Sequence, residues 1–113
     1  MKEIKAVIQP FMLENVLDAL REYGDLPGLT VTEVLGWGKP GTAIVPGGPH
    51  EGAHAFAKRT KLEIVLSDET ADAVVDLITR ATRTGRRGDG KVFLFNVKDV
   101  IKIRTGERGV SAL

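Results

Sequence analysis

The sequence contains no cysteine, few aromatic residues and almost no excess of charge of either sign. Its 113 residues include 16 lysines and arginines against 15 acidic residues, and 5% are aromatic. Without cysteine the chain forms no disulfide or zinc–thiolate site, and nothing in it argues for secretion. A net charge of +1 gives no bulk attraction to nucleic acid, so any anion site must be a local cluster. Because no apolar run approaches the length of a membrane span, we expect a cytoplasmic protein without membrane insertion.

Hydrophobic periodicity predicts two halves that each read strand, helix, strand. Alternating apolar residues predict strands, and stripes at helical spacing predict helices. The strands are expected over residues 3–9, 29–35, 58–66 and 91–97, and the helices over 13–23 and 68 to about 83. Two such halves give an α+β, ferredoxin-like βαββαβ fold, with four antiparallel strands and both helices on one face. Alternation over residues 100–104 adds an extra short C-terminal strand.

The sheet face away from the helices is predicted to be apolar. Val7, Val65 and either Phe93 or Leu94 are expected on it. An apolar face of this size is rarely left in water. We therefore infer an oligomer that buries it.

A long segment between the two halves has no periodicity. Residues 37–57 contain five glycines and three prolines, and Lys39 and Glu51 are the charged residues before the next strand begins. Aperiodic connections of this length are uncommon inside a small domain and are usually functional or disordered. This segment is therefore a candidate signalling arm at the tip of a hairpin.

The second distinctive segment, 84–91, reads TGRRGDGK. Its three glycines allow backbone N–H groups to approach an anion, and its two arginines and its lysine supply positive charge. The run follows a predicted helix, so it is neither a Walker A loop nor a dinucleotide-binding turn. The two interpretations left open are a phosphate cradle and a solvated basic turn.

The predicted C-terminal strand favours the cradle. Alternation places Lys102 and Arg104 on one face, with Ile101 and Ile103 directed to the core. Together with Lys91, they would put three cations on one rim, which suits a diphosphate or triphosphate. The alternative is a charged edge strand that resists aggregation.

Several motifs together resemble the PII nitrogen-regulatory signal-transduction family. They are TGRRGDGKVF (84–93), IRTGE (103–107), KAVIQPF (5–11), LTVTEV (29–34) with GWG (36–38), and KLEIV (61–65). The similarity extends over the whole chain, which looks like a divergent member with an atypical T-loop. It implies one PII-like domain over residues 1–113, with a T-loop at about 37–57, a B-loop at about 83–91 and a C-terminal tail at 105–113.

The resemblance also implies ligands and partners. Family members are trimers that bind ATP or ADP, with Mg²⁺, in clefts between subunits, and their T-loop acts on a target protein such as a transporter or a metabolic enzyme. The nucleotide-binding positions implied for this chain are Thr30, Gly36, Trp37, Gly38, Lys39, Val65, Gly88, Asp89, Gly90, Lys91, Lys102 and Arg104. The family's effector-binding lysine falls at Arg59, or at the neighbouring Lys58. Trp37 would stack near the adenine or pack at the cleft, and we favour packing.

The T-loop departs from the family pattern. Pro40 stands where members carry a glutamine that chelates Mg²⁺ and 2-oxoglutarate, and Gly52 stands where many bacterial members carry a uridylylated tyrosine. Proline supplies no ligand atom from its side chain. We therefore expect neither the usual binding mode of 2-oxoglutarate nor uridylylation. His50 and His54 would suit a metal only if the segment became helical, and we favour solvated histidines.

The leading hypothesis is a nucleotide-sensing regulator that is not an enzyme. One alternative is a regulator of the same kind that responds to another small anion or a metal. A second is a slow ATPase, although Asp89 and Glu107 are the acids near the predicted cradle and no base–nucleophile pair is visible. A third is RNA binding through Phe93 and Phe95, which the low aromatic content disfavours.

Overall fold

The computed structural model of the chain describes residues 1–38 and 56–113. In these ranges the elements follow the predicted order. They are β1 (Lys2–Ile8), the short 3-10 helix η1 (Pro10–Met12), α1 (Leu13–Tyr23), β2 (Thr30–Gly36), β3 (Ala57–Leu66), α2 (Asp68–Thr82), β4 (Gly90–Asn96) and η2 (Gly109–Ala112). The predicted α+β fold is confirmed.

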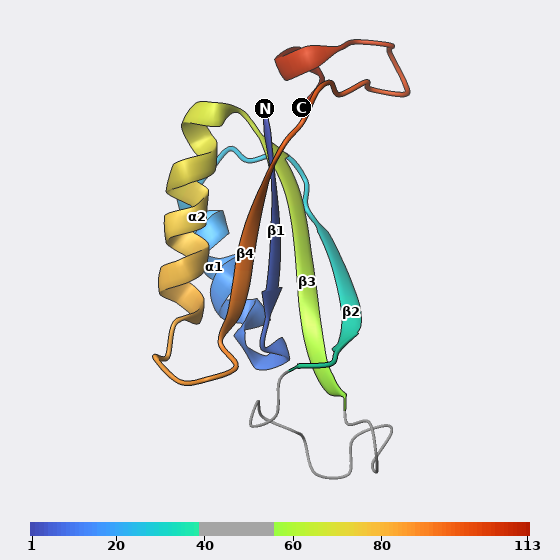
Figure 1. Cartoon of the computed structure of the whole chain (residues 1–113). Coiled ribbons are helices and arrows are strands. Elements are labelled where there is room, and N and C mark those ends of the chain that lie inside the picture. The colour runs from blue at the N-terminus through green and yellow to red at the C-terminus, as the bar shows by residue number, and fades with distance from the viewer. Residues whose placement is uncertain (39–55) are drawn as a thin grey trace.

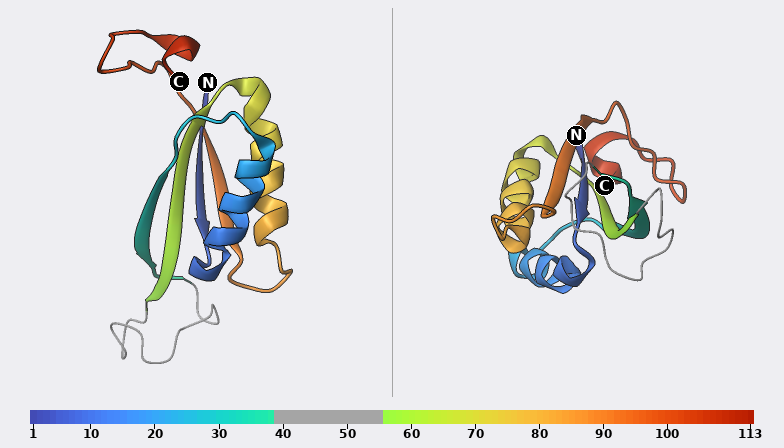
Figure 2. Two further views of the ribbon diagram at one scale, coloured as in Figure 1. Left: turned by 180° about the vertical axis from the view of Figure 1, so that it is seen from behind. Right: turned by 60° about the horizontal axis from the view of Figure 1, so that its bottom comes forward.

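The strands form one antiparallel sheet in the order β2-β3-β1-β4. Both helices cover the same face of this sheet, and the opposite face carries neither helix (Figures 1 and 2). The core lies between the helices and the sheet. Its members are Ile4, Ala6, Ile8, Val16, Leu20, Leu62, Ile64, Leu66, Ala71, Val74 and Ile78. These residues form the apolar faces that the sequence periodicity predicted for the strands and helices.

The two helices begin and end where the sequence places breaking residues. α1 starts directly after the turn that begins with Pro10, and it ends before Gly24, which adopts φ 104°. α2 starts after Ser67, whose carbonyl oxygen accepts the N–H of Ala71 at 3.0 Å. The Ser67 hydroxyl bonds to the Thr70 hydroxyl at 2.9 Å and caps no backbone N–H. No helix in the described ranges is long and apolar enough to cross a membrane.

The open face of the sheet is more polar than predicted. Register places Phe93 opposite Lys5 on this face, whereas Leu94 lies opposite Ile4 on the helix side. The ammonium of Lys5 lies 5.7 Å from the ring centre of Phe93 and 4.9 Å from that of Phe95. These distances are typical of cation–π contacts. The face therefore mixes aromatic and charged side chains.

The predicted C-terminal strand is wrong as a strand of the sheet. Of residues 100–104, Ile101 makes an isolated bridge with Arg108, and the segment bends away beyond β4 (Figure 1). Ile101 and Ile103 are not in the core: they are 49% and 99% exposed. Asp99 holds the bend, because its carboxylate accepts the N–H groups of Val100 and Gly109 at 2.8 and 3.1 Å. The C-terminal tail is thus a folded loop.

Candidate functional site

The B-loop is held in shape by one of its own side chains. The Asp89 carboxylate accepts the backbone N–H of Thr84 at 2.8 Å, that of Gly85 at 2.9 Å, and the Thr84 hydroxyl. The Thr84 hydroxyl oxygen in turn accepts the N–H of Arg86 at 3.1 Å. Asp89, predicted from the family to bind nucleotide, therefore has both of its carboxylate oxygens bonded to its own loop.

This bonding also perturbs the acidity of Asp89. The bond from the Thr84 hydroxyl, followed by the backbone N–H groups, lowers the pKa of Asp89 below its ordinary value of 3.8. Donors directed at a carboxylate favour its charged form. The stabilisation from these hydrogen bonds is therefore expected to be fully present above pH 3.8. It is lost as the pH falls through the lower pKa that Asp89 has in the folded protein. Carboxyl titration by NMR checks this, and a midpoint for Asp89 at or above 3.8 would contradict it.

Replacing Asp89 with asparagine is expected to loosen the B-loop. An amide has one acceptor oxygen, so it cannot accept all three donors that the carboxylate accepts. We expect the rate of amide hydrogen exchange at Thr84 and Gly85 to rise about tenfold, because the loop loses the stabilisation of roughly one hydrogen bond. The control is Asp72→Asn, an exposed acid on α2. Unchanged exchange in the Asp89 variant would show that the carboxylate does not hold the loop.

Gly90 lets the B-loop join the sheet. It has φ 104°, and a Cβ added to it would overlap the carbonyl oxygen of Val7 on the neighbouring strand β1. Only glycine tolerates both conditions. The glycine thus brings Lys91, the first cation of β4, directly beside the end of β1, opposite Val7.

A side-chain network connects the B-loop to the strands of the hairpin. The amide nitrogen of Gln9 donates to the Gly88 carbonyl oxygen at 2.7 Å, and its amide oxygen accepts from Arg59 at 3.1 Å. Arg59 also donates to the carbonyl oxygen of Lys58 at 3.1 Å. Arg59, a predicted effector residue, therefore lies beside the B-loop.

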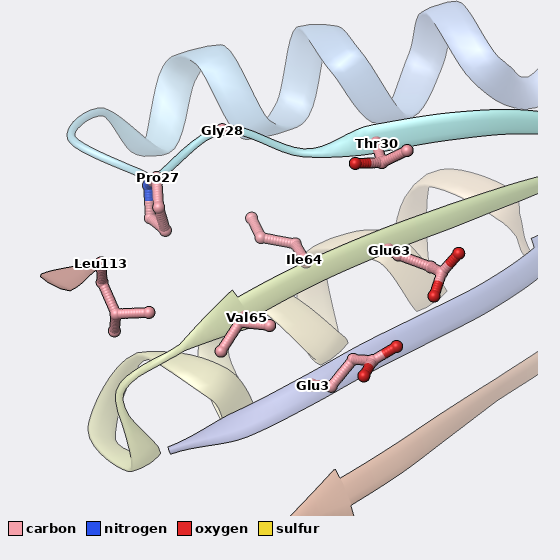
Figure 3. A pocket seen from close by; sticks show the side chains of 8 residues that line it. All are labelled: Glu3, Pro27, Gly28, Thr30, Glu63, Ile64, Val65 and Leu113. Atoms are coloured by element: carbon pink, nitrogen blue, oxygen red, sulfur yellow. The ribbon is translucent and has the colours of Figure 1, made fainter. Parts of the chain in front are cut away.

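A pocket of about 340 Å³ opens near the other end of the sheet. Figure 3 shows its lining, which comes from β1, β2, β3, the turn before β2 and the last residue: Glu3, Thr30, Glu63, Ile64, Val65, Pro27, Gly28 and Leu113. Two predicted nucleotide residues, Thr30 and Val65, thus share one pocket. The sequence interpretation missed Glu3 and Glu63, because strand alternation does not reveal which side chains of neighbouring strands meet.

Glu3 and Glu63 share a hydrogen bond inside this pocket. That bond, with help from burial, raises the pKa of Glu3. The same bond, and then the bond from Lys61, lowers the pKa of Glu63. The ammonium of Lys61 lies 3.3 Å from the Glu63 carboxylate. The two neighbouring carboxyl groups therefore differ in acidity, with Glu3 the weaker acid of the two.

The predicted nucleotide residues fall into two groups at opposite ends of the molecule. Gly36, Trp37, Gly38 and the B-loop lie at the end that leads into residues 39–55. Thr30 and Val65 lie nearer the N-terminus, and the tail segment that carries Lys102 and Arg104 follows β4 at that same end (Figure 1). The seven residues of β4 separate them, a span of roughly 20 Å. The predicted rim of three cations is therefore not assembled within one chain.

The cations of the two groups differ in their partners. Among the described residues, Lys91 and Arg104 form no ion pair, and both are exposed. The ammonium of Lys102 lies 3.8 Å from the carboxylate of Glu107, a loose contact that an anion can replace. Lys39, Pro40, His50, Gly52 and His54 lie outside the described residues.

Comparison with known proteins identifies the family. The sequence model described as "Nitrogen regulatory protein P-II" matches residues 1–107. The chain belongs to this family. Over the full length of both chains, it is 49% identical to the nitrogen regulatory protein P-II of Rhizobium meliloti and 46% identical to that of Bradyrhizobium diazoefficiens. It is also 46% identical, again over both full lengths, to nitrogen regulatory protein P-II 1 of Escherichia coli K12.

Membership confirms the resemblance drawn from the motifs. P-II proteins are signal-transduction regulators in nitrogen metabolism and not enzymes. The chain is accordingly a regulatory protein of this kind.

Proposed function

We propose that this P-II protein senses ATP and ADP at the contacts between three copies of the chain and acts on a partner protein through its T-loop. The observation that carries the proposal is the separation of the predicted nucleotide residues into two half-sites. The first half-site comprises Gly36–Gly38 and Gly88–Lys91, and the second comprises Thr30, Val65, Lys102 and Arg104.

A head-to-tail contact would bring the first half-site of one copy to the second half-site of the next. A contact of this heterologous type closes into a ring when the rotation between copies permits it. The ring would also cover apolar surface that a single copy exposes, including Phe93, Phe95 and the fully exposed Ile103. Lys91, Lys102 and Arg104 would then surround one phosphate chain, together with the Mg²⁺ that accompanies it.

The T-loop is the segment whose conformation such a site would control. Gly36 ends β2, and Trp37 and Gly38 continue directly into residues 39–55. A nucleotide bound at the first half-site would therefore contact the base of the loop. ATP and ADP produce different signals only if they contact this base differently. The partner would be a transporter or a metabolic enzyme of nitrogen assimilation, and Lys58 or Arg59 would bind a second, anionic effector.

Calorimetry with ATP, ADP and AMP tests the proposal, with and without Mg²⁺ and 2-oxoglutarate. We expect ATP and ADP to bind, and light scattering to give a mass of about three times the 12.2 kDa of the chain. We expect 2-oxoglutarate to add no heat, because Pro40 replaces a chelating side chain. A phosphate-release assay distinguishes this regulator from the alternative of a slow ATPase, which would release phosphate in steady state. A monomer that binds neither nucleotide would contradict the proposal.

A further inference from the structure

Gln9 lies where three parts of the molecule meet. It follows the last residue of β1, and its backbone is fixed because its carbonyl oxygen accepts the N–H of Met12 at 3.0 Å. Its amide nitrogen bonds to the B-loop at Gly88, and its amide oxygen bonds to Arg59 on β3. The two bonds require opposite ends of the amide, so a single orientation of the side chain satisfies both.

Arg59 extends this connection across the base of the hairpin. It lies opposite Val34 in the pairing of β2 with β3. A Cβ added to Gly36 would lie 3.4 Å from the Arg59 side chain, so the side chain passes directly over the end of β2. The contacts therefore form a continuous series, from Gly36 through Arg59 and Gln9 to Gly88.

Gly88 is also fitted closely to this series. A Cβ added there would lie 3.0 Å from the Gln9 amide nitrogen and 3.6 Å from the Arg59 guanidinium. Gly88 has φ 93°, which few other residues adopt. The Gly88 peptide therefore lies against both side chains without an intervening group, so a change in its orientation must alter the bond to Gln9.

We propose that Gln9 is a positioning residue that couples the B-loop to the two strands that carry the T-loop. The proposal rests on the proposed function, in which the B-loop contacts the phosphates of the nucleotide. Phosphate oxygens that bond to the N–H groups of the B-loop favour one orientation of the Gly88 peptide. That orientation decides whether Gln9 keeps its bond to Gly88, and so whether Arg59 is held against Gln9 or released toward the ends of β2 and β3.

The first test needs no nucleotide. In the unliganded protein, Gln9→Ala is expected to raise amide exchange about tenfold both at residues 85–90 and at residues 57–60. Arg59→Ala removes the bonds to Gln9 and to the Lys58 carbonyl oxygen, neither of which is made to the B-loop itself. It is expected to raise exchange at residues 85–90 as well. Gln9→Glu keeps an acceptor for Arg59 but has no N–H for Gly88, so it should raise exchange at 85–90 alone.

The matched control is Asn96→Ala, which removes an amide at the opposite end of the sheet, where its oxygen accepts from Lys2 at 2.6 Å. This variant is expected to leave exchange at both segments at the parent level. Parent-level exchange at residues 85–90 in Arg59→Ala would overturn the coupling.

The second test uses nucleotide and the single tryptophan of the chain. Trp37 directly follows β2 and is 67% exposed. In Gln9→Ala we expect ATP and ADP still to bind, each with an affinity within about tenfold of the parent, whereas the difference in Trp37 emission between the two nucleotides falls by at least about 80%. A full difference in emission would overturn the proposal. If the parent binds neither nucleotide, the proposed function fails, and the exchange test still decides whether Gln9 connects the two segments.

Discussion

Gly90→Ala is expected to lower the free energy of unfolding by more than about 3 kcal/mol, a large share of the about 5–15 kcal/mol by which small domains are stable. Two effects add at this position. The backbone has φ 104°, which strains any residue with a Cβ. The added atom would also overlap the Val7 carbonyl oxygen and lie 3.2 Å from the Cα of Ile8, both of which belong to the central strand β1. Neither atom can move without displacing the strand.

Gly85→Ala provides the matched control within the same loop. Gly85 has φ 82°, but a Cβ added to it meets nothing within 4 Å. Gly85→Ala should therefore lower the free energy of unfolding only by the backbone strain, about 1–2 kcal/mol. Urea denaturation of the parent and the two variants measures both values. Equal costs would show that β4 separates from β1 at Gly90 without penalty.

Lys91→Ala and Arg104→Ala are each expected to weaken the binding of both ATP and ADP by about 1.5–3 kcal/mol, the value of a hydrogen bond to a charged group. This corresponds to roughly a 10-fold to 150-fold loss of affinity, measured by calorimetry. The two substitutions should be similar in effect although Lys91 lies at the start of β4 and Arg104 lies in the tail beyond the end of β4. If both variants bound ATP and ADP like the parent, the assignment of Lys91 and Arg104 to the nucleotide site would be wrong.

Mixing the two variants distinguishes a shared site from a site within one chain. Each variant keeps one intact half-site, so random assembly of equal amounts would restore about a quarter of the contacts with both halves intact. We expect high-affinity ATP binding at roughly that fraction after the variants are unfolded and refolded together. Refolding each variant alone is the control, and no recovery in the mixture would place both cations in one chain's own site.

The regular elements could be predicted from sequence because local periodicity determines them. The change from alternation to helical spacing at Leu13, and the glycine at position 24, gave the bounds of α1. Alternation likewise located β3 to within one residue of its start at Ala57. In these segments, the faces that the pattern predicts to be apolar are the faces that pack in the core.

The C-terminal segment shows where such reasoning fails. Alternation indicates that one side of a segment is suited to burial, but it does not say which surface buries it. Ile101 and Ile103 alternate with Lys102 and Arg104, yet no described strand of this chain lies beside them. The pattern is explained if the burying surface belongs to another copy, as in the proposed ring.

Asp89 and Gln9 could not be interpreted from sequence for a different reason. An acid in a glycine-rich run fits ligand binding and loop bracing equally well, and only the positions of Thr84 and Gly85 decide. The partners of Gln9 lie 79 and 50 residues away along the chain. No local pattern connects residues so far apart, so the contact became visible only in the folded chain.

The placement of the two half-sites at opposite ends of the sheet has a genetic consequence. In a head-to-tail ring every chain contributes to two binding sites. A chain altered in both half-sites would then disable about two of the three sites in any ring that it joins. An allele that encodes such a chain should therefore be dominant over the normal allele, whereas an allele whose product is mostly lost to unfolding before it joins a ring should be recessive.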